Sequence, residues 1–327
     1  AYTGFLKERS PSVVMVWNGS LLVTRALAEA ANELSIKTLF LERGLLPQSL
    51  IFDPSGVNNQ SIMAGPDWTE NAVESVSEET RKQLMAYCQS VQQNQLSIVQ
   101  SGSHQAPDSV REQLQIPHGQ PVVLLPLQIE TDSNIIENSP LYKSMKTLIK
   151  DVVTALSSQD TLLIVKPHPE DKARKAEIES LCDSGKVRVS WDLTLPSILS
   201  VTDLVVVINS TVGLESLMQN KPVITLGRSI YDRKGFTHDV FAREELTEVI
   251  HQGLVQPEYP HDVPQFWRFL LTLIRRHTFF YNFSGELDGK AWLRAELQGL
   301  PSAMLATNSL ELDVLDQIIT YLEQVLE

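Results

Sequence analysis

The fold is decided by residues 161–227, which read TLLIVKPHPEDKARKAEIESLCDSGKVRVSWDLTLPSILSVTDLVVVINSTVGLESLMQNKPVITLG. This stretch contains short apolar runs rich in β-branched residues, a composition typical of strands buried on both faces of a parallel sheet. The runs are Leu162–Val165, Val187–Val189, Leu204–Ile208 and Val223–Leu226. Segments with helical spacing, at 172–181, 195–201 and 211–218, separate them. The stretch therefore predicts a βαβαβαβ order around a parallel sheet.

Polar side chains follow these predicted strands. In a sheet of this kind the ligand binds in the crevice outside the carboxyl ends of the strands. We therefore expect the ligand-binding residues to include Lys166, His168, Asn209, Ser210, Thr211, Gly227 and Arg228.

A lysine ends the first of these strands, and a histidine held between two prolines follows it. Proline fixes its own φ angle and biases the preceding residue toward extended backbone, so Pro167 and Pro169 aim Lys166 and His168 rigidly. A lone histidine is more often structural, but this setting favours a ligand-binding group.

Residues 209–215 read NSTVGLE and predict a turn from a strand into a helix. The free N–H groups and the positive dipole end of such a helix suit a phosphate. An N-cap at Ser210, with Glu215 as a first-turn acid in a capping box, explains the same residues. The two interpretations are compatible.

The chain opens with a second unit of strand, turn, helix and strand. The expected elements are a strand at 13–17, a helix at 21–34 and a strand at 38–41. Gly19 allows a tight turn or a close approach to a ligand, whereas Asn18 equally fits a helix cap. Glu42 leaves the second strand for a polar loop, as either a catalytic residue or a solvated surface charge.

A polar segment follows the predicted buried strand Val122–Leu125 and precedes an expected helix at 141–156. It contains Gln128, Asp132 and Ser133 where the crevice of the sheet should lie. Asp132 is a candidate catalytic residue, and an N-cap or Asx-turn explains it equally well because Asp-Ser-Asn is ordinary turn chemistry.

Composition limits the classes of function. A net charge of −13 argues against a nucleic-acid binder, although a local basic site for an anionic substrate is compatible with it. Cys88 and Cys182 do not make a disulfide framework or a metal-ligand pattern, which predicts a reducing, cytoplasmic setting. No apolar run approaches the roughly 20 residues of a membrane span, so membrane contact is expected to be peripheral.

An amphipathic helix is expected at 263–276, with apolar side chains at helical spacing. We expect it to pack across the domain interface. Trp267, Phe269, Arg275 and Arg276 leave open a peripheral contact with anionic lipid. A further amphipathic helix is expected at 310–326.

Residues 226–238, LGRSIYDRKGFTH, resemble the G-x-x-x-Y-x-x-x-G-x-T-H signature of the bacterial capsule polysaccharide synthesis family, the retaining β-Kdo glycosyltransferases. Further stretches are similar to this family's pattern in the family's order. They are 41–53 with Glu42, Gly44 and Asp53, 126–133 with Gln128, Asp132 and Ser133, 166–169, and 209–215.

This resemblance implies two Rossmann-like domains that face a cleft in a GT-B-like architecture. We expect an N-terminal, acceptor-side domain at 1–120, because a Pro-, Gly- and Ser-rich connection covers 101–120. A nucleotide-sugar-binding domain is expected at 121–260, with C-terminal helices at 261–327 that pack across both. The start at Ala1, close to the first predicted strand, suggests a module of a longer protein.

The resemblance also implies the donor CMP-β-Kdo, with no further cofactor and no metal. The residues implied in donor binding are Lys166, Ser210 and Thr211 for the phosphate, His168 and Pro169 for cytidine monophosphate, Glu215 for the ribose, and Asn209, Gly213, Gly227 and Tyr231 around them. Asn18 and Gly19 line the other side of the expected cleft.

Two carboxylates and the histidine carry the implied chemistry. Asp132 matches the proposed nucleophile, and Glu42 matches an acidic residue on the acceptor side that acts as general acid or base. His168 assists departure of the nucleotide. The acceptor is expected to be a glycan or a lipid-linked sugar, with the enzyme cytoplasmic or peripheral on the inner membrane.

Other readings remain open at this point. A sialyltransferase-type enzyme or a UDP-sugar 2-epimerase also places a His-Pro pair and a glycine-containing turn before a helix. A non-catalytic module that binds a glycan or nucleotide sugar is the alternative outside the enzymes.

Overall fold

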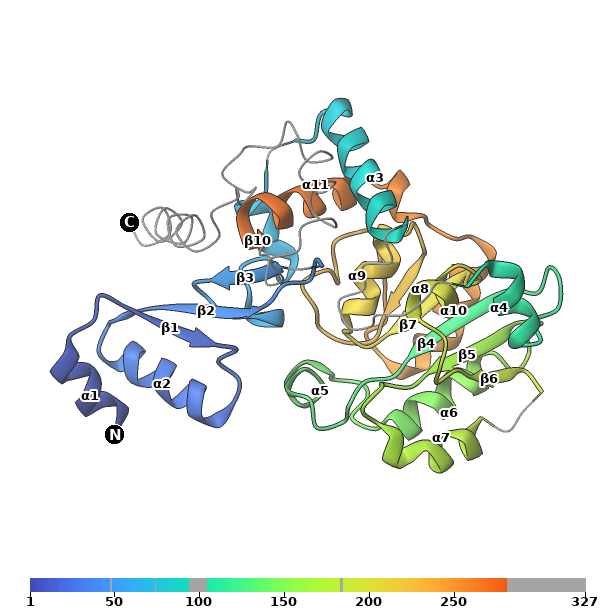
Figure 1. The fold of residues 1–327 in the computed structure, drawn as a ribbon, viewed down its shortest axis with the longest axis horizontal. Helices are drawn as coiled ribbons and strands as arrows, with labels where there is room; N and C mark the ends of the chain where they lie inside the picture. The colour runs from blue at the N-terminus through green and yellow to red at the C-terminus, as the bar shows by residue number, and fades with distance from the viewer. Residues whose placement is uncertain (48, 74, 94–104, 183–184, 281–327) are drawn as a thin grey trace. The chain divides into compact units, whose positions relative to one another are not determined.

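The computed structural model describes the whole chain except residues 48, 74, 94–104, 183–184 and 281–327 (Figure 1). The described residues form two compact units: those of 1–90 and those from 267 onward make unit 1, and those of 91–266 make unit 2. These divisions differ from the expected ones at 120 and 260. Helix α4 (Pro107–Gln113) contacts α8 (Leu195–Leu199) within unit 2, and residues after 266 add a strand to the sheet of unit 1.

Unit 2 is built on a six-stranded sheet in which every pair of neighbours is parallel. Its order is β6-β5-β4-β7-β8-β9, the doubly wound Rossmann order. The strands are β4 (Val122–Pro126), β5 (Leu162–Lys166), β6 (Val187–Val189), β7 (Leu204–Val207), β8 (Val223–Thr225) and β9 (His238–Asp239). The parallel sheet expected from residues 161–227 is confirmed.

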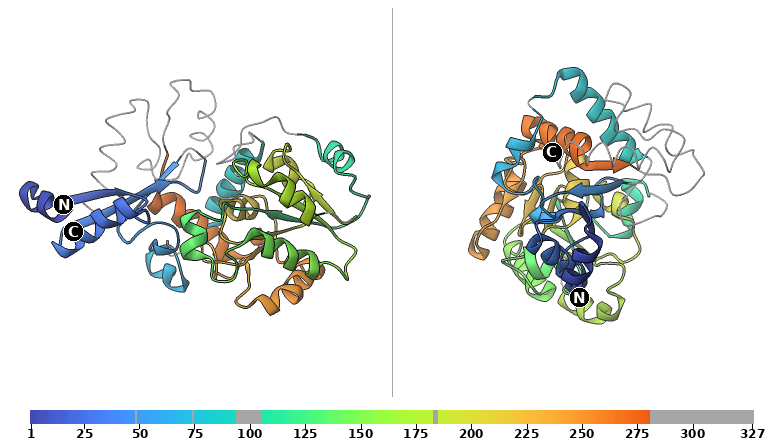
Figure 2. Two further views of the ribbon diagram at one scale, coloured as in Figure 1. Left: turned by 90° about the horizontal axis from the view of Figure 1, so that it is seen from below. Right: turned by 90° about the vertical axis from the view of Figure 1, so that its left-hand side faces the viewer.

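Helices cover both faces of this sheet (Figure 2). Helix α6 (Met145–Ala155) contacts α7 (Lys175–Leu181) and α10 (Leu246–Val255), and together they enclose the main hydrophobic cluster. Helix α9 (Thr211–Met218) packs against β7 and β8, and α4 packs against α8. Burial on both faces explains why the strands of the sheet are continuous apolar runs.

Two helices of unit 2 were not expected. α4 begins at Pro107 inside the segment interpreted as a connection, because proline is favoured in the first turn of a helix. α5 (Ser133–Asn138) occupies the polar segment after β4, and the helix expected from 141 begins only at Met145. Both are short, and such helices form through tertiary contacts more than through their own propensity.

Unit 1 contains a four-stranded mixed sheet in the order β1-β2-β3-β10. β1 (Val13–Trp17) and β2 (Lys37–Arg43) are parallel, whereas β3 (Ser49–Asp53) and β10 (Thr278–Phe280) join by antiparallel pairing. Helices α1 (Tyr2–Arg9) and α2 (Leu22–Glu33) lie against one face, where Val14 and Val16 are buried with Leu6, Ala30 and Ala31.

The remaining elements of unit 1 come from distant parts of the chain. They are the 3₁₀ helix Pro66–Asn71, most of α3 (Glu78–Gln93), α11 (Pro264–Thr272) from Trp267 onward, and the π-helical turn Leu273–His277. Trp68 and Phe269 meet edge to face, and Arg268 donates to the Val73 carbonyl.

The lipid contact considered for Trp267 and Phe269 is wrong, because both side chains are buried in the core. None of the described helices combines the length and hydrophobicity of a membrane span. The helix expected at 310–326 lies outside the described residues.

Candidate active site

The strand order of unit 2 reverses between β4 and β7, and doubly wound sheets bind ligands at this point. Gln128, in the loop after β4, donates from Nε2 to Oδ1 of Asn209, which follows β7, over 2.9 Å. The two residues were singled out separately in the sequence. The structure brings them together at the switch point.

Asn209 also fastens α5 to this point. Its Nδ2 donates to the carbonyl oxygens of Asn134 (3.1 Å) and Asn138 (3.3 Å). The Asn138 carbonyl accepts a second hydrogen bond, from the backbone N–H of Arg228 after β8 (2.8 Å). Three loops at the carboxyl edge of the sheet are therefore joined through the end of α5. Asn134 and Asn138 were missed in the sequence, where only the turn chemistry of 132–134 pointed to this segment.

Gly227 has a packing reason to be glycine. A Cβ atom added there would lie 2.7 Å from Cγ2 of Ile208 and 3.0 Å from the Asn138 carbonyl oxygen. The backbone after β8 thus approaches the backbone after β7 more closely than any side chain allows. This role is structural and needs no ligand.

The start of α9 is held from inside the protein. Ser210 is its N-cap and accepts the Val212 N–H at Oγ over 3.3 Å, while the buried Tyr231 hydroxyl donates to the Ser210 carbonyl oxygen. Burial raises the pKa of Tyr231 above its ordinary range. A Cβ on Gly213 would lie 2.6 Å from Cζ of Tyr231. Tyr231 and Gly213 therefore pack on the buried side of the turn. The half-buried Ser210 and Thr211 form its accessible surface.

Glu215 does not lie in the first turn of α9, which contains no acidic residue. It lies in the second turn and is buried. The interpretation as a first-turn acid with a capping-box contact is therefore wrong, because the helix begins at Thr211 and places Glu215 one turn deeper.

The Lys-Pro-His-Pro segment leaves β5, the strand next to β4. Lys166 is only 5% exposed and donates from Nζ to the Trp191 carbonyl over 2.9 Å. Burial lowers its pKa, and Asp192 acts in the opposite direction. His168 is half-buried and Pro169 is exposed.

A backbone hydrogen bond fixes the tautomer of His168. Its Nδ1 accepts the N–H of Glu170 over 3.3 Å. In the neutral ring the hydrogen is then on Nε2, because Nδ1 is the acceptor. Nε2 is the nitrogen that can donate to a ligand.

Asp132 is the N-cap of α5, and its Oδ1 accepts the N–H of Asn134 over 2.7 Å. The carboxylate is exposed, and Ser133 is the first residue of the helix. The capping alternative is therefore what the fold requires of this residue. It uses Oδ1 and is compatible with chemistry at Oδ2.

The sequence did not predict that an ion pair anchors the loop after β4. Glu130 accepts the N–H of Met145 at the start of α6 (2.6 Å) and pairs with Nη1 of Arg174 (3.1 Å). Arg174 also pairs with Asp171 and Glu177. Residues this far apart in sequence carry no local signal of their pairing.

In unit 1, Asn18 and Glu42 form a pair at the carboxyl ends of β1 and β2. Asn18 donates from Nδ2 to Oε2 of Glu42 over 2.5 Å, and the Arg43 N–H donates to Oε1 over 2.8 Å. Asn18 and Gly19 have φ angles of 64° and 81°, and a Cβ on Gly19 would lie 2.7 Å from the Phe40 ring. Glu42 is half-buried with a fixed orientation, which distinguishes it from a freely solvated charge.

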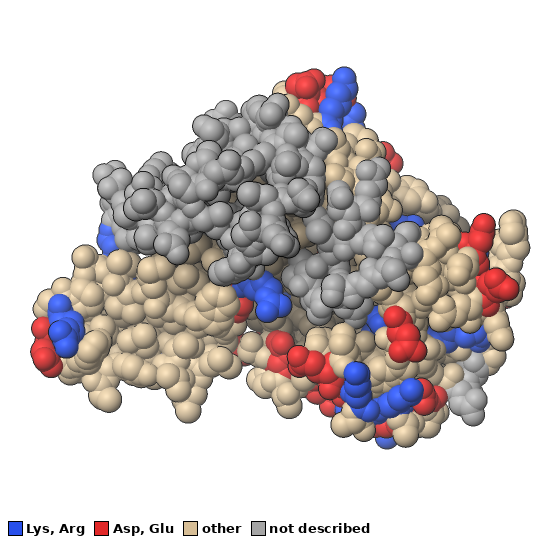
Figure 3. Space-filling view, viewed as in Figure 1, with Lys and Arg blue, Asp and Glu red and all other residues tan. Residues whose placement is uncertain are grey.

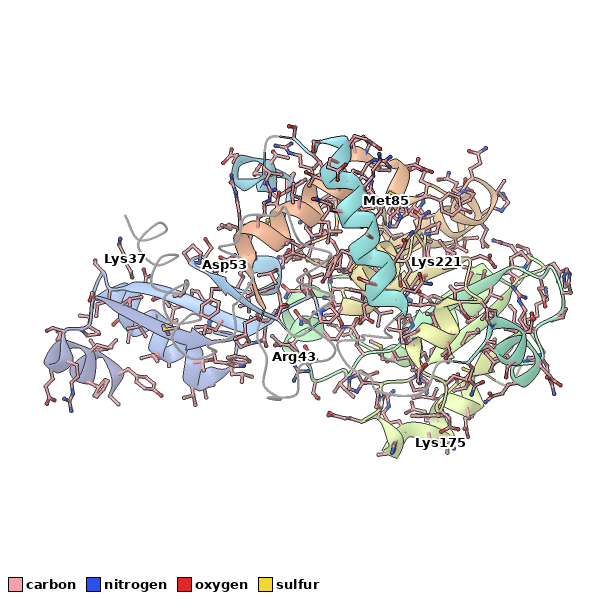
Figure 4. All side chains as sticks on the ribbon, turned by 45° about the horizontal axis from the view of Figure 1, so that its top comes forward. Lys37, Arg43, Asp53, Met85, Lys175 and Lys221 are labelled. Carbon is pink, nitrogen blue, oxygen red and sulfur yellow. The ribbon has the colours of Figure 1, made fainter. Side chains whose placement is uncertain are left out.

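Asp53, labelled in Figure 4, holds the loop after β3. Its buried carboxylate accepts from the N–H groups of Ser55, Gly56 and Ile62 and from the Ser61 hydroxyl. Burial raises its pKa, and these hydrogen bonds act in the opposite direction. The structure of the loop thus explains Asp53, a residue that matches the family's pattern. Among the described residues, no group of three or more His, Cys, Asp or Glu side chains is arranged to hold a metal ion.

The sequence model of a family described as "Capsule polysaccharide biosynthesis protein" matches residues 89–253, just over half of the 327-residue chain. FixF of Sinorhizobium fredii is 29% identical over 229 residues, which are 67% of this chain and 49% of FixF. The capsule polysaccharide export protein KpsS of Escherichia coli is 31% identical over 122 residues, 34% of this chain and 31% of KpsS. The chain spans about half or less of the length of these curated relatives.

Two solved structures from Thermosulfurimonas dismutans share the fold. The KpsC beta Kdo 2,7 transferase superposes with a TM-score of 0.58 at 18% identity, covering 91% of this chain and 88% of its own. The KpsC beta Kdo 2,4 transferase gives a TM-score of 0.55 at 22% identity, covering 73% and 78%. The α/β, GT-B-like fold class expected from the sequence is confirmed.

Proposed function

The chain belongs to the capsule polysaccharide biosynthesis protein family, and on this premise we propose that it is a retaining glycosyltransferase. Its donor is CMP-β-Kdo, and its acceptor is a glycan or a lipid-linked sugar. The fold shared with two β-Kdo transferases supports this assignment.

The observation that carries the proposal is the assembly at the switch point of unit 2. The Gln128–Asn209 bond, the end of α5 and the capped start of α9 make one fixed edge, next to β5, the strand that His168 follows. The helix start offers backbone N–H groups to a phosphate, and Nε2 of His168 offers a further donor. A nucleoside monophosphate fits this set of donors.

In the proposed reaction the Asp132 carboxylate attacks the anomeric carbon of Kdo. The bond to CMP breaks, and its electron pair leaves with the phosphate. The acceptor hydroxyl then displaces Asp132 and gives its proton to a general base. Two inversions give net retention, because each attack comes from the face opposite the leaving group.

The leaving phosphate gains negative charge, which His168 and the N-terminus of α9 stabilise. Lys166 is proposed to act through its charge at longer range, because its Nζ already donates to the Trp191 carbonyl. The buried Glu215 is retained as the ribose-binding candidate.

The first test is a calorimetric titration with CMP, with UDP and GDP in parallel. We expect selective binding of CMP, and about tenfold or greater weakening in His168→Ala, as for loss of a hydrogen bond to a charged group. His251→Ala is the matched control, because that histidine is exposed on α10.

A preference for UDP would overturn the donor assignment and favour a UDP-sugar enzyme. Selective CMP binding without transfer from CMP-Kdo to any glycan or glycolipid acceptor would instead favour a non-catalytic binding module. NMR of a transfer product reports the anomeric configuration, and an inverted product would refute the double displacement.

A further inference from the structure

A segment almost free of charge runs through residues 10–28, where Arg25 is the only charged residue in a chain of net charge −13. The segment covers β1 and the first turns of α2. It contains side chains of unusual exposure: Met15 44%, Trp17 50%, Leu21 59%, Leu22 86% and Val23 62%. In the space-filling view the surface over β1 and α2 shows almost no charged groups (Figure 3).

Four of these side chains lie at the carboxyl end of β1 and the start of α2. Trp17 is the last residue of the strand; because its neighbour Val16 points into the core under α2, Trp17 points from the opposite face of the strand. The turn at 18–20 connects Trp17 directly to Leu21, the N-cap of α2, and to Leu22 and Val23 in its first turn. We call Trp17, Leu21, Leu22 and Val23 the apolar tip.

The tip projects from unit 1. Successive residues of a helix point about 100° apart around its axis. Because Leu21, Leu22 and Val23 are all exposed, the start of α2 is open to solvent over most of its circumference. Soluble proteins rarely expose apolar side chains in such a cluster unless the cluster is an interaction site.

We propose that the apolar tip is a membrane contact that inserts among the headgroups of a bilayer containing anionic phospholipid. Tryptophan and leucine are the side chains favoured at this depth of a bilayer. Lipids rearrange around a projection, whereas a protein partner needs a matching hollow.

The distribution of charge favours an anionic lipid surface over other partners. Residues 1–43 contain five Lys and Arg against four Asp and Glu, a net charge of +1, which leaves −14 on the rest of the chain. An acidic protein is repelled by an anionic surface, so its contact region must lack acidic side chains. Arg25, four residues after Leu21, is exposed and lies 4.0 Å from the equally exposed Glu29, so this pair adds no net charge beside the tip.

The proposal goes beyond the proposed function and is tested without it. The full chain is floated with vesicles of phosphatidylglycerol and phosphatidylethanolamine, and with vesicles of phosphatidylcholine alone. We expect flotation with the anionic vesicles that weakens as salt is added. The doubly substituted Leu22→Gln/Val23→Gln chain should bind at least about tenfold more weakly, because two inserted side chains are lost.

The matched control is Phe241→Gln/Val255→Gln, since these apolar side chains on unit 2 are 63% and 61% exposed but isolated. It should float like the wild type. Both double variants should keep the wild-type melting temperature, because all four side chains are exposed. Equal flotation of the Leu22/Val23 variant and the wild type would overturn the proposal.

A spectroscopic measurement locates the insertion. Vesicles with brominated acyl chains quench tryptophans that enter the bilayer, and Trp68 and Trp267 are buried in the protein. We expect quenching in the wild type that is largely lost in Trp17→Phe, whose flotation persists. No flotation of the wild type, together with a dimer that the Leu22/Val23 variant abolishes, would instead assign the tip to a second copy of this chain and refute the membrane contact.

Discussion

Asp132 serves the fold and, in the proposed mechanism, the chemistry, through different oxygens of one carboxylate. Oδ1 accepts the Asn134 N–H and caps α5. An asparagine caps a helix about as well as an aspartate but cannot act as a nucleophile. The two roles can therefore be separated by one substitution.

We predict that Asp132→Asn loses transfer by about 10⁴-fold or more, as expected for removal of a nucleophile. Its CMP affinity should stay close to that of the wild type, and its unfolding free energy should change by less than about 0.5 kcal/mol. A transfer assay, calorimetry and urea denaturation measure the three quantities. Ser133→Ala is the control at the next residue. A fully active Asp132→Asn would remove this residue from the mechanism.

His277 gives unit 1 a dependence on pH. It is buried, its Nδ1 lies 3.9 Å from Oδ2 of Asp53, and burial lowers its pKa to about 4. The folded state keeps the ring neutral, whereas the unfolded state is protonated below about pH 6.5. The stabilisation is therefore complete above about pH 6.5 and is lost as the pH falls toward 4.

We predict that unit 1 loses about 3 kcal/mol of unfolding free energy between pH 7 and pH 4 through His277. Asp53 offsets part of this loss near the acidic limit, because its raised pKa makes the folded state take up a proton first. Urea denaturation at a series of pH values measures the slope. His277→Phe should flatten it and the exposed His251→Phe should not; an unchanged slope in His277→Phe would contradict this account.

Helix α5 is the element on which the proposed donor site depends. It has only six residues, too few to be stable alone, and Asn209 ties the carbonyls of its second and last residues to the loop after β7. Gln128 orients the same asparagine from the other side. The helix therefore stays in place through tertiary hydrogen bonds.

We predict that Asn209→Asp releases α5 from the sheet. The carboxylate has the same shape but cannot donate, and it faces the carbonyl oxygens of Asn134 and Asn138. The unfolding free energy should fall by about 1–3 kcal/mol. Amide hydrogen exchange should quicken at Ile135 and Ile136, which donate to the Asp132 carbonyl, while the strands β4 and β5 stay protected.

The matched control is Asn220→Asp, because the side chain of Asn220 accepts rather than donates in its bond with the His261 N–H. It should leave exchange in α5 unchanged. Unaltered protection of α5 in Asn209→Asp would show that the helix is held by other contacts.

At the scale of the whole molecule, the two units differ in how they are assembled from the chain. Unit 2 is continuous and contains every strand of its sheet. Unit 1 needs β10 from residues 278–280 to pair with β3, and it needs Thr272, whose Oγ1 accepts the Val73 N–H. Residues 272–280 are thus structural for unit 1.

We predict that a chain shortened to residues 1–266 keeps a folded unit 2 that binds CMP as the full chain does. Its first 90 residues should become sensitive to proteases, because β3 loses one of its two neighbouring strands, β10, and Trp68 loses Phe269. Limited proteolysis and calorimetry measure both effects. Equal protease resistance of residues 1–90 in the shortened and full chains would contradict the assignment of residues 267–280 to unit 1.

The sequence was most informative where structure follows from short-range composition. The strands β4 to β8 begin and end within a residue or two of the predicted apolar runs, because strands buried on both faces must be apolar throughout, whereas the short β9 was not predicted. Two of the strand-end residues selected in the sequence, Gln128 and Asn209, lie together at the switch point. Asn18 and Glu42 were also selected, although their hydrogen bond could not be read from either residue alone.

The sequence by itself determined the α/β class, the parallel order of residues 161–227 and the edge of the sheet where polar groups collect. Only the tertiary structure decided what those groups touch. It assigned Tyr231, Gly213 and Gly227 to packing, buried Lys166 against the Trp191 carbonyl, and added β10 to unit 1. The physical reason is that periodicity records whether a side chain is buried, whereas its partners lie tens or hundreds of residues away and are chosen by the packing of the whole unit.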